Sequence, residues 1–455
     1  MSEAPSRGRL LQVLGVAFGL AVSIGNTIAA GIVRTPGEIA TYLPTPWLFI
    51  SVWLAGGLYA LLGSNSIAEL GTAVPKSGGQ YVFAHRAIGP YAGFIVGWSD
   101  WMSTCGTNAA VSIVIGEYSS ELLAAFLPGK RDLWEVPIAT IVVLGFAALN
   151  WRGIRRGSAA QELTSLLKAL IFLAIVAACF LFGKRGAESA EAATAAAPAG
   201  KALVVAFILA LQAVMYTYDG WTGPIYFSEE VKNPERSIPR AMFAGALGIL
   251  GIYALFNLAL LYILPVSRIA GEKFAMGAAA QVVFGPAGDT IARAGDTIAR
   301  GLMVVCLLSG INAYVLMTSR VLFAMSRDGL FSRRATQVNE GGTPTLALAL
   351  STGVALAFLW SGTFNQVINI CAFFFVANYT ISFTSVFVLR RREPDLPRPF
   401  RAWGHPWTTG LVLLGSVAYL AGVVLSDPKT SSISIILLAL SYPAFRLMKL
   451  PRRSE

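Results

Sequence analysis

The first long apolar segment of this chain contains the stretch Ser23-Ile24-Gly25-Asn26-Thr27-Ile28-Ala29-Ala30-Gly31 in its middle and outer part. Two glycines, an asparagine and two hydroxyl side chains interrupt a run that otherwise suits a membrane helix. Inside a bilayer every backbone N–H and C=O group needs a partner, so non-helical backbone survives there only where it lines a protein cavity. The stretch therefore predicts a broken membrane helix whose break contributes to a binding site.

A second interruption lies in the sixth apolar segment, at Tyr216-Thr217-Tyr218-Asp219-Gly220-Trp221-Thr222-Gly223-Pro224. Asp219 would cost at least about 2.5 kcal/mol in a continuous helix that faces lipid. Segments one and six each begin a set of five, which is where an inverted five-plus-five repeat places its discontinuous helices. The alternative is that these glycines and this proline mark only close helix packing or kinks.

Two such breaks suit a small zwitterion. The half-helix after a break presents free N–H groups and the positive end of its dipole, which favour a carboxylate. The half-helix before a break presents carbonyl groups, which favour an ammonium group. The sequence therefore predicts that both ends of one zwitterion are held by main-chain groups.

The composition supports a membrane protein. Of 455 residues, 55% are hydrophobic and 13% charged, whereas soluble domains carry about 25% charged residues. A spanning helix needs about 20 mostly apolar residues. Twelve segments meet this requirement: 10–33, 46–70, 88–125, 134–150, 159–182, 202–226, 238–264, 300–325, 343–360, 364–389, 405–425 and 430–447. We therefore expect an all-α integral membrane protein with twelve transmembrane helices and a five-plus-five inverted repeat.

This expectation divides the chain into seven parts. They are a cytosolic tail (1–9), a first five-helix repeat (10–182), an outer loop (183–201), a second five-helix repeat (202–389), a cytosolic loop (390–404), two peripheral helices (405–447) and a cytosolic tail (448–455). With both termini in the cytosol, most Lys and Arg residues fall on the inner side, as the positive-inside rule requires. The net charge of +11 is thus a signal of topology and lipid contact, and we expect no nucleic-acid partner.

The sequence offers little for covalent chemistry. Its two histidines, His85 and His405, fall in predicted cytosolic loops and lack the spacing of a metal or nucleophile motif. The four cysteines lie inside apolar segments, where they serve as small core residues. We expect neither an enzyme nor a cofactor. The loop at residues 126–133 has no cysteine, so we expect no disulfide-linked heavy chain.

Lys168 is the most informative single residue, because the fifth segment continues from it as a wholly apolar run to Phe182. A lysine inside the membrane is rare and indicates function by default. The alternative is that its side chain reaches back to the cytosolic headgroups.

Other polar residues lie at membrane depth. Asn108, Asn312 and Tyr314 must pair with other helices, with water or with substrate. Asp100 and Glu117, on the third segment, are candidates for a proton site or for a counter-ion to a basic substrate. Alternatively, Asp100 pairs with a lysine or arginine, and Glu117 reaches the outer surface.

Three features lie outside the breaks. Glu229 and Glu230 are near Lys232, Arg236 and Arg240, which indicates either an intracellular ion-pair gate or solvated loop charge. The heptad AGDTIAR occurs twice in tandem, at 287–293 and 294–300, and predicts a lengthened outer end of the eighth helix. The low-complexity stretch 187–200 predicts a flexible outer loop.

Several motifs together resemble the amino acid/polyamine/organocation transporter superfamily, and most closely its L-type and cationic amino-acid permease branches. The resemblance covers nearly the whole chain. It rests on Gly25-Asn26-Thr27-Ile28-Ala29-Ala30-Gly31-Ile32, Ala68-Glu69-Leu70-Gly71, Pro75-Lys76-Ser77-Gly78-Gly79-Gln80-Tyr81, Gly89-Pro90-Tyr91, Tyr218-Asp219-Gly220-Trp221, Glu229-Glu230-Val231-Lys232-Asn233-Pro234, Ile238-Pro239-Arg240-Ala241, Arg327-Asp328-Gly329 and Pro397-Arg398-Pro399-Phe400.

The resemblance implies roles for individual residues. Backbone N–H groups of Ala29, Ala30 and Gly31, which stand where the family has Gly-Ser-Gly, would bind the substrate carboxylate. The substrate-binding residues it implies, together with the polar candidates above, are Thr27, Ile28, Ala29, Ala30, Gly31, Asn108, Tyr216, Thr217, Asp219, Asn312 and Tyr314. Carbonyls near Thr27, Tyr216, Thr217 and Asp219 would take the amine, and Tyr216 would close over the substrate or serve as a packed aromatic.

The resemblance also assigns a role to Lys168. Sodium-independent relatives carry a lysine where sodium-coupled relatives bind the ion, so its ammonium would bridge the first and eighth helices. We therefore expect a sodium-independent amino-acid transporter of the cell (inner) membrane, driven by exchange or by a proton gradient. The alternatives are a transporter of polyamines or other organic cations, gripped by Asp100 and Asp219, and a non-transporting membrane sensor.

Overall fold

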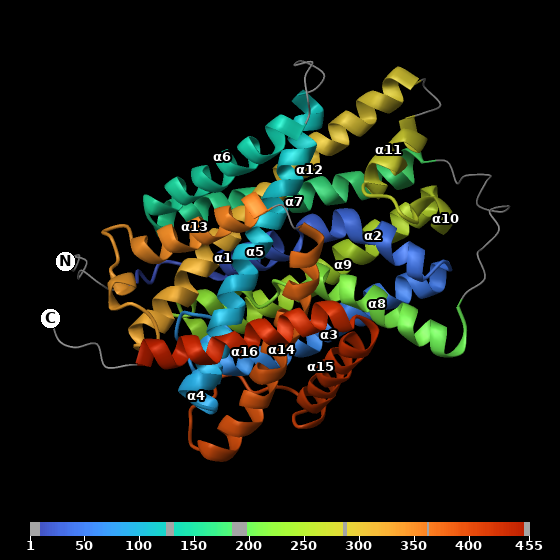
Figure 1. Ribbon diagram of the computed structural model, residues 1–455. Helices are drawn as coiled ribbons and strands as arrows, with labels where there is room; N and C mark the ends of the chain where they lie inside the picture. The colour runs from blue at the N-terminus through green and yellow to red at the C-terminus, as the bar shows by residue number, and fades with distance from the viewer. Residues whose placement is uncertain (1–9, 124–131, 184–197, 285–288, 362–363, 450–455) are drawn as a thin grey trace.

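The computed structural model describes residues 10–123, 132–183, 198–284, 289–361 and 364–449 (Figure 1). These residues form helices joined by loops. The helices are α1 (Val16–Thr27), α2 (Ala30–Tyr42), α3 (Pro46–Ala73), α4 (Gln80–Ala87), α5 (Pro90–Leu123), α6 (Asp132–Trp151), α7 (Ile154–Phe182), α8 (Gly200–Tyr218), α9 (Pro234–Ile263), α10 (Val266–Ile269), α11 (Ala275–Phe284), α12 (Asp289–Arg327), α13 (Thr345–Ser361), α14 (Phe364–Arg392), α15 (Trp407–Ser426) and α16 (Pro428–Lys449), with the short 3-10 helices η2 (Gly223–Phe227) and η4 (Arg333–Thr336).

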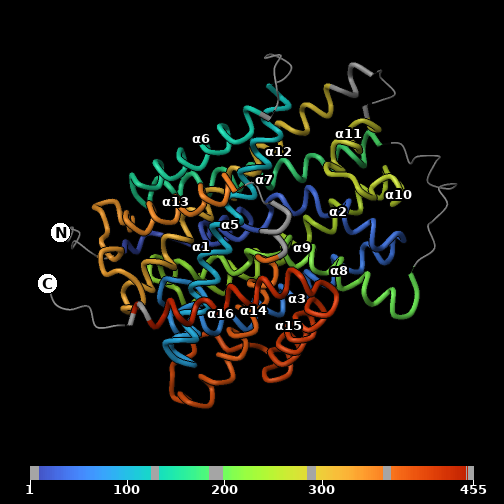
Figure 2. Tube along the Cα trace, viewed as in Figure 1, coloured from blue at the N-terminus to red at the C-terminus, as the bar shows by residue number. Residues whose placement is uncertain are grey.

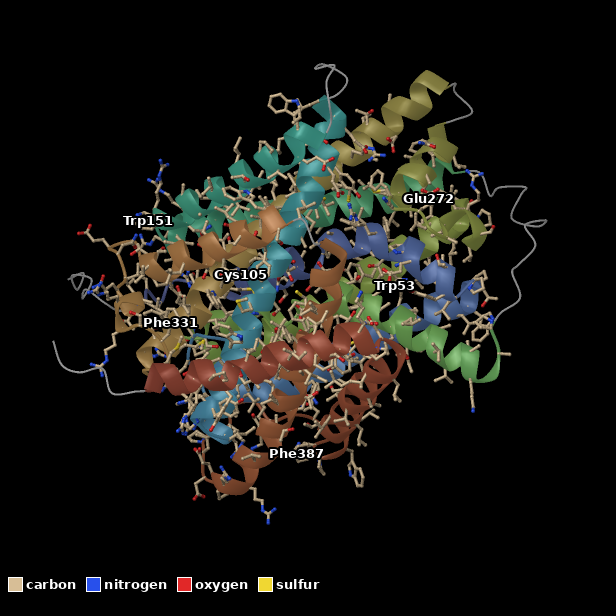
Figure 3. The ribbon with its side chains drawn as sticks, in the orientation of Figure 1. Trp53, Cys105, Trp151, Glu272, Phe331 and Phe387 are labelled. Atoms are coloured by element: carbon tan, nitrogen blue, oxygen red, sulfur yellow. The ribbon has the colours of Figure 1, made fainter. Side chains whose placement is uncertain are left out.

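The long helices form one bundle. Figure 1 shows α5 crossing steeply through it, and α5 packs against α12, α6, α14 and α4. The Cα trace in Figure 2 places the short helices α10 and α11 at the end of the bundle near α2. In Figure 3, Trp151 and Glu272 mark opposite ends, whereas Trp53 and Cys105 lie inside, where both are buried.

Length and apolar composition make eight described helices able to cross a bilayer, or nine if the bent pair α1–α2 counts as one span. Each of the twelve expected segments overlaps one of the long helices or, in the first case, this pair. Helices α5, α13 and α16 lie in expected segments but are not among the eight helices that pass this test of length and apolar composition. Helix α13 has only 17 residues. Large apolar side chains remain exposed on α6, α7 and α15, which suits contact with lipid. The chain is a multi-pass membrane protein.

The first span and the position of His85 differ from the sequence-based expectation. The first span begins at Val16 and continues to Tyr42, beyond the expected end at residue 33. Arg34 and Pro36 suggest a helix end, but Arg34 is paired with Glu117 of α5, and packed neighbours tolerate a proline inside a membrane helix. His85 lies in the short helix α4 and not in an irregular loop.

The duplicated heptad lies in α12, which begins at Asp289. The expected extension of the eighth helix is therefore confirmed for residues 289–300 of the repeat. Residues 287–288 lie outside the described residues. In the second copy Arg300 bonds Asp296 one turn earlier at 2.8 Å and also forms an ion pair with Glu121 of α5. The repeat therefore ties α12 to α5. Residues 187–197 of the low-complexity stretch lie outside the described residues.

A buried carboxylate organises the loop between α14 and α15. Glu69 of α3, 2% exposed, accepts hydrogen bonds from Arg390 and from the backbone N–H of Ala402 at 2.7 Å. Arg398 approaches the same carboxylate at 3.4 Å. Arg390 therefore has a structural partner in addition to its role as a signal of orientation.

We expect Glu69→Gln to destabilise the protein by about 3 kcal/mol, because it leaves two arginines without their buried counter-charge. The measurement is thermal unfolding of the purified protein in detergent. Glu393→Gln is the matched control, because Glu393 pairs with Arg86 at 2.6 Å but both side chains are about a third exposed. That surface pair should contribute no more than about 1 kcal/mol. Equal losses for the two variants would contradict the assignment.

Candidate functional site

The first segment is broken where the sequence indicates. Helix α1 ends at Thr27 and α2 begins at Ala30, with a bend of 42° between them. Ile28 and Ala29 form the break, and both are buried. The break therefore faces protein and not lipid.

The start of α2 presents unpaired donors. The N–H of Ile28 donates to Ile24 at 3.0 Å, and that of Ala29 donates to Thr27 at 2.9 Å. The next N–H groups, from Ala30 to Ile32, lie in the first turn of α2, where a helix supplies no acceptor. No side chain caps this end among the residues that the structure describes. A helix start of this kind favours an anion.

The second break packs directly on the first. Helix α8 ends at Tyr218, and the backbone turns through Asp219 to Thr222 before η2 begins. Gly220 has φ of 114°, and a Cβ there would lie 2.7 Å from Asn26 Nδ2. A Cβ on Gly31 would lie 2.9 Å from Thr217 Cα. Glycine is therefore required on both sides of this contact.

Two tyrosines satisfy the carbonyls freed at the breaks. The Tyr253 hydroxyl of α9 donates to Thr27 O at 2.7 Å and to Thr217 O at 3.0 Å, so it joins the two breaks. The Tyr314 hydroxyl of α12 donates to Asn26 O at 3.0 Å. The sequence analysis missed Tyr253, because a tyrosine inside an apolar segment gives no signal that separates it from an ordinary packed aromatic.

Lys168 reaches into the first break. Its side chain is fully buried in α7, and its Nζ donates to Gly25 O at 2.9 Å and to Ile28 O. The alternative of a side chain extending to the headgroups is therefore wrong. Lys168 supplies hydrogen-bond donors to carbonyls that have lost their helical partners.

The remaining candidates fall into two groups. Asn312 donates to Gly157 O and to Gln161 Oε1 and accepts from Asn150, so it joins α12 to α7 and α6. Thr217 Oγ1 lies 2.8 Å from Thr35 Oγ1. By contrast, Asn26 Oδ1, Thr27 Oγ1 and Asn108 Oδ1 are among the buried side-chain oxygens that lack a hydrogen-bond partner within the described residues. Tyr216 is buried beside the second break.

Asp100 and Glu117 of α5 are engaged differently. Asp100 accepts from the Tyr226 hydroxyl, not from a lysine or arginine, and Glu117 pairs with Arg34 of α2. The Arg34–Glu117 pair joins α2, the second half of the broken segment, to α5. Its side chains are 23% and 32% exposed.

Two ion pairs lie beyond η2. Glu230 and Arg320 bond at 3.0 Å with side chains 0% and 1% exposed, and Glu229 bonds Arg327 at 2.6 Å. The expected neighbours Lys232, Arg236 and Arg240 are not their partners, and solvated loop charge is the wrong description of Glu230. Burial raises the pKa of the Glu230 carboxyl, which the Arg320 guanidinium opposes.

The segment before α1 is fastened to the same loop. The N–H of Leu14 donates to Glu230 O, and the N–H of Lys232 donates to Leu14 O, each at 2.8 Å. Backbone pairing and the buried ion pair thus hold this end of the bundle closed. Among the described residues, no cluster of His, Cys, Asp or Glu could hold a metal ion.

Known proteins resemble this chain over nearly its full length. A family model described as amino acid permease matches residues 9–441. The serine/threonine exchanger SteT of Bacillus subtilis is 29% identical, with 97% of each chain covered. The human b(0,+)-type amino acid transporter 1 is 23% identical over 97% of this chain and 88% of its own. The mouse Asc-type amino acid transporter 1 is 26% identical over 98% and 82%. The chain, a transporter and not an enzyme, belongs to the amino acid permease family.

Proposed function

We propose that this permease is a sodium-independent secondary transporter of amino acids that works by alternating access, through exchange or proton-coupled uptake. The observation that carries the proposal is the direct packing of two helix breaks with opposite polarity of free main-chain groups. We propose further that the protein lies in the cell membrane with both termini in the cytosol. Its twelve spans would form a five-plus-five inverted repeat. The names of its relatives, an exchanger and two amino-acid transporters, support the substrate class.

The substrate carboxylate would bind the N–H groups at Ala29, Ala30 and Gly31, at the start of α2. The ammonium group would bind carbonyls at Thr27, Tyr216, Thr217 and Asp219, with Ile28 shaping the loop and Tyr216 closing over the ligand. Thr27 O and Thr217 O already accept from Tyr253. A carbonyl oxygen has two lone pairs, so an ammonium group can share Thr217 O with Tyr253. Thr27 O also accepts from the N–H of Ala29, so there an ammonium group would displace one of the two donors. The unpartnered oxygens of Asn26, Thr27 and Asn108 suit further donors on a ligand or water.

Lys168 would stand in for a sodium ion at this site. Its Nζ contacts with Gly25 O and Ile28 O are the kind that a cation makes with the carbonyls of an unwound helix. An ammonium group held permanently by the protein leaves no need for a dissolved cation. This supports transport that does not depend on sodium.

Alternating access would separate the two closed ends in turn. The buried Glu230–Arg320 pair would part when the inner end opens, and the half-exposed Arg34–Glu117 pair would part when the outer end opens. Both connect a broken segment, or the loop after it, to α5 or α12. They therefore lie where rocking of the broken helices against the remaining helices changes distances most.

We expect purified protein in proteoliposomes to take up at least one labelled neutral or cationic amino acid at the same rate in sodium and in choline buffer. Decarboxylated analogues should compete poorly, because the N–H groups of α2 would lose their anion. The measurement is uptake of a panel of twenty labelled amino acids, with and without internal substrate and an inward pH step. Strong competition by amines without a carboxylate would favour a polyamine or organic-cation carrier, and no uptake of any amino acid would favour a sensor.

We expect Lys168→Ala to reduce uptake about tenfold or more, because two buried carbonyls of the first break lose their donor. The control is Lys201→Ala at the exposed start of α8, which should transport as the unmodified protein does. Gel filtration and thermal unfolding report whether the variant is folded. Unchanged uptake by a folded Lys168→Ala protein would contradict the role.

A further inference from the structure

Asp100 is a buried acid without a cationic partner. It lies in α5 with 2% exposure, and the Tyr226 hydroxyl donates to it at 2.8 Å from each carboxyl oxygen. No Lys, Arg or His forms an ion pair with it among the residues described. The proposed binding of substrate by main-chain groups does not use this carboxyl.

A second unpaired acid lies nearby. Asp219, in the second break, accepts from the Tyr379 hydroxyl of α14, and it lies in the same sixth segment as Tyr226, which bonds Asp100. Two negative charges without a cation are costly at this depth, several kcal/mol each. The neutral, protonated form of Asp100 avoids that cost while Tyr226 still bonds it.

The helices packed against α5 carry other ionisable groups. None of those named below forms an ion pair with Asp100. On α4, Tyr81 donates to Asp328, and His85 stacks on Tyr81. On α12, Arg320 and Arg327 pair with glutamates of the loop after η2, and Cys306 is buried. On α14, Cys371 and Tyr379 are both buried. Glu135 of α6 lies beside Gly116, and Tyr442 of α16 packs on Tyr91. Helix α13 contains no ionisable residue.

The bond between Asp100 and Tyr226 crosses the boundary that transport would open. Tyr226 belongs to η2, the continuation of the sixth segment, whereas Asp100 belongs to α5 of the surrounding helices. Rocking of the broken helices would pull Tyr226 away from Asp100 and admit water. Water stabilises the charged carboxylate, so the proton is bound in the closed arrangement and released in an open one.

We propose that Asp100 binds one proton each time the transporter closes around its substrate. The carboxylate takes the proton from a hydronium ion, which leaves as water, and returns it to water on opening; no other bond changes. This inference rests on the proposed transport function, because it requires movement of the sixth segment. It adds a proton-binding site separate from Lys168 and from the main-chain groups of the breaks.

The first test is the pH dependence of uptake, with equal pH inside and outside the proteoliposomes. In the unmodified protein, uptake should fall as pH rises, by up to about tenfold per pH unit above the pKa of the titrating carboxyl, because only the protonated form closes. Asp100→Asn mimics that form and should transport with little dependence on pH. Tyr226→Phe should retain the dependence with a shifted midpoint, because the carboxyl remains but loses its hydrogen bond.

Glu121→Gln is the matched control, because Glu121 is an acid of the same helix that pairs with Arg300. It should keep the pH profile of the unmodified protein. An equal slope in Asp100→Asn and the unmodified protein would overturn the proposal. Loss of the slope in Asp219→Asn but not in Asp100→Asn would also overturn it, in favour of Asp219.

The second test does not depend on transport. Infrared difference spectra of the purified protein in lipid should contain a C=O band of a protonated carboxyl at neutral pH, and the band should be absent from Asp100→Asn and present in Glu121→Gln. A protein that shows this band but transports no amino acid would refute the proposed function and not the proton site. Identical bands in Asp100→Asn and the unmodified protein would refute the proton site.

Discussion

Backbone polar groups released from a helix inside a membrane must be satisfied by other parts of the protein, and this constraint organises the centre of the permease. The breaks at Ile28–Ala29 and at Asp219–Thr222 pack on each other through glycine. The Tyr253 hydroxyl and the Lys168 ammonium then supply donors to carbonyls that the helices no longer serve. The N–H groups at the start of α2 are left over, and a helix start of this kind favours an anion.

Much of this centre could be predicted from the sequence because its signals are local. Gly25, Asn26 and Asp219 are unusual in an apolar run, and a lysine at position 168 is costly in lipid. Each residue therefore indicates a position that faces protein or a binding site and not lipid. The family resemblance added roles to these positions. The direct packing of the breaks was expected from the repeat, and the close approach of Gly220 to Asn26 agrees with it.

Tertiary pairing was harder to predict. Glu230 and Arg320 are 90 positions apart, and Arg34 and Glu117 are 83 apart, so nothing local connects them. Nearer charges such as Lys232 appeared to be better partners. Tyr253 gave no signal because its ring fits an apolar segment and only its hydroxyl bonds the breaks. The two pairs also differ in kind: Glu230–Arg320 is desolvated and insensitive to salt, whereas Arg34–Glu117 is partly exposed and screened by ions.

The duplicated heptad has a practical consequence for imaging. Helix α12 carries it as a rigid extension that projects past its neighbours in Figure 1 and is anchored by Arg300 to Glu121. A chain of 48.3 kDa buried mostly in a detergent belt offers few features for particle alignment in electron microscopy. A binder or fused helical domain attached to this projection would supply such a landmark, because the extension projects past its neighbours.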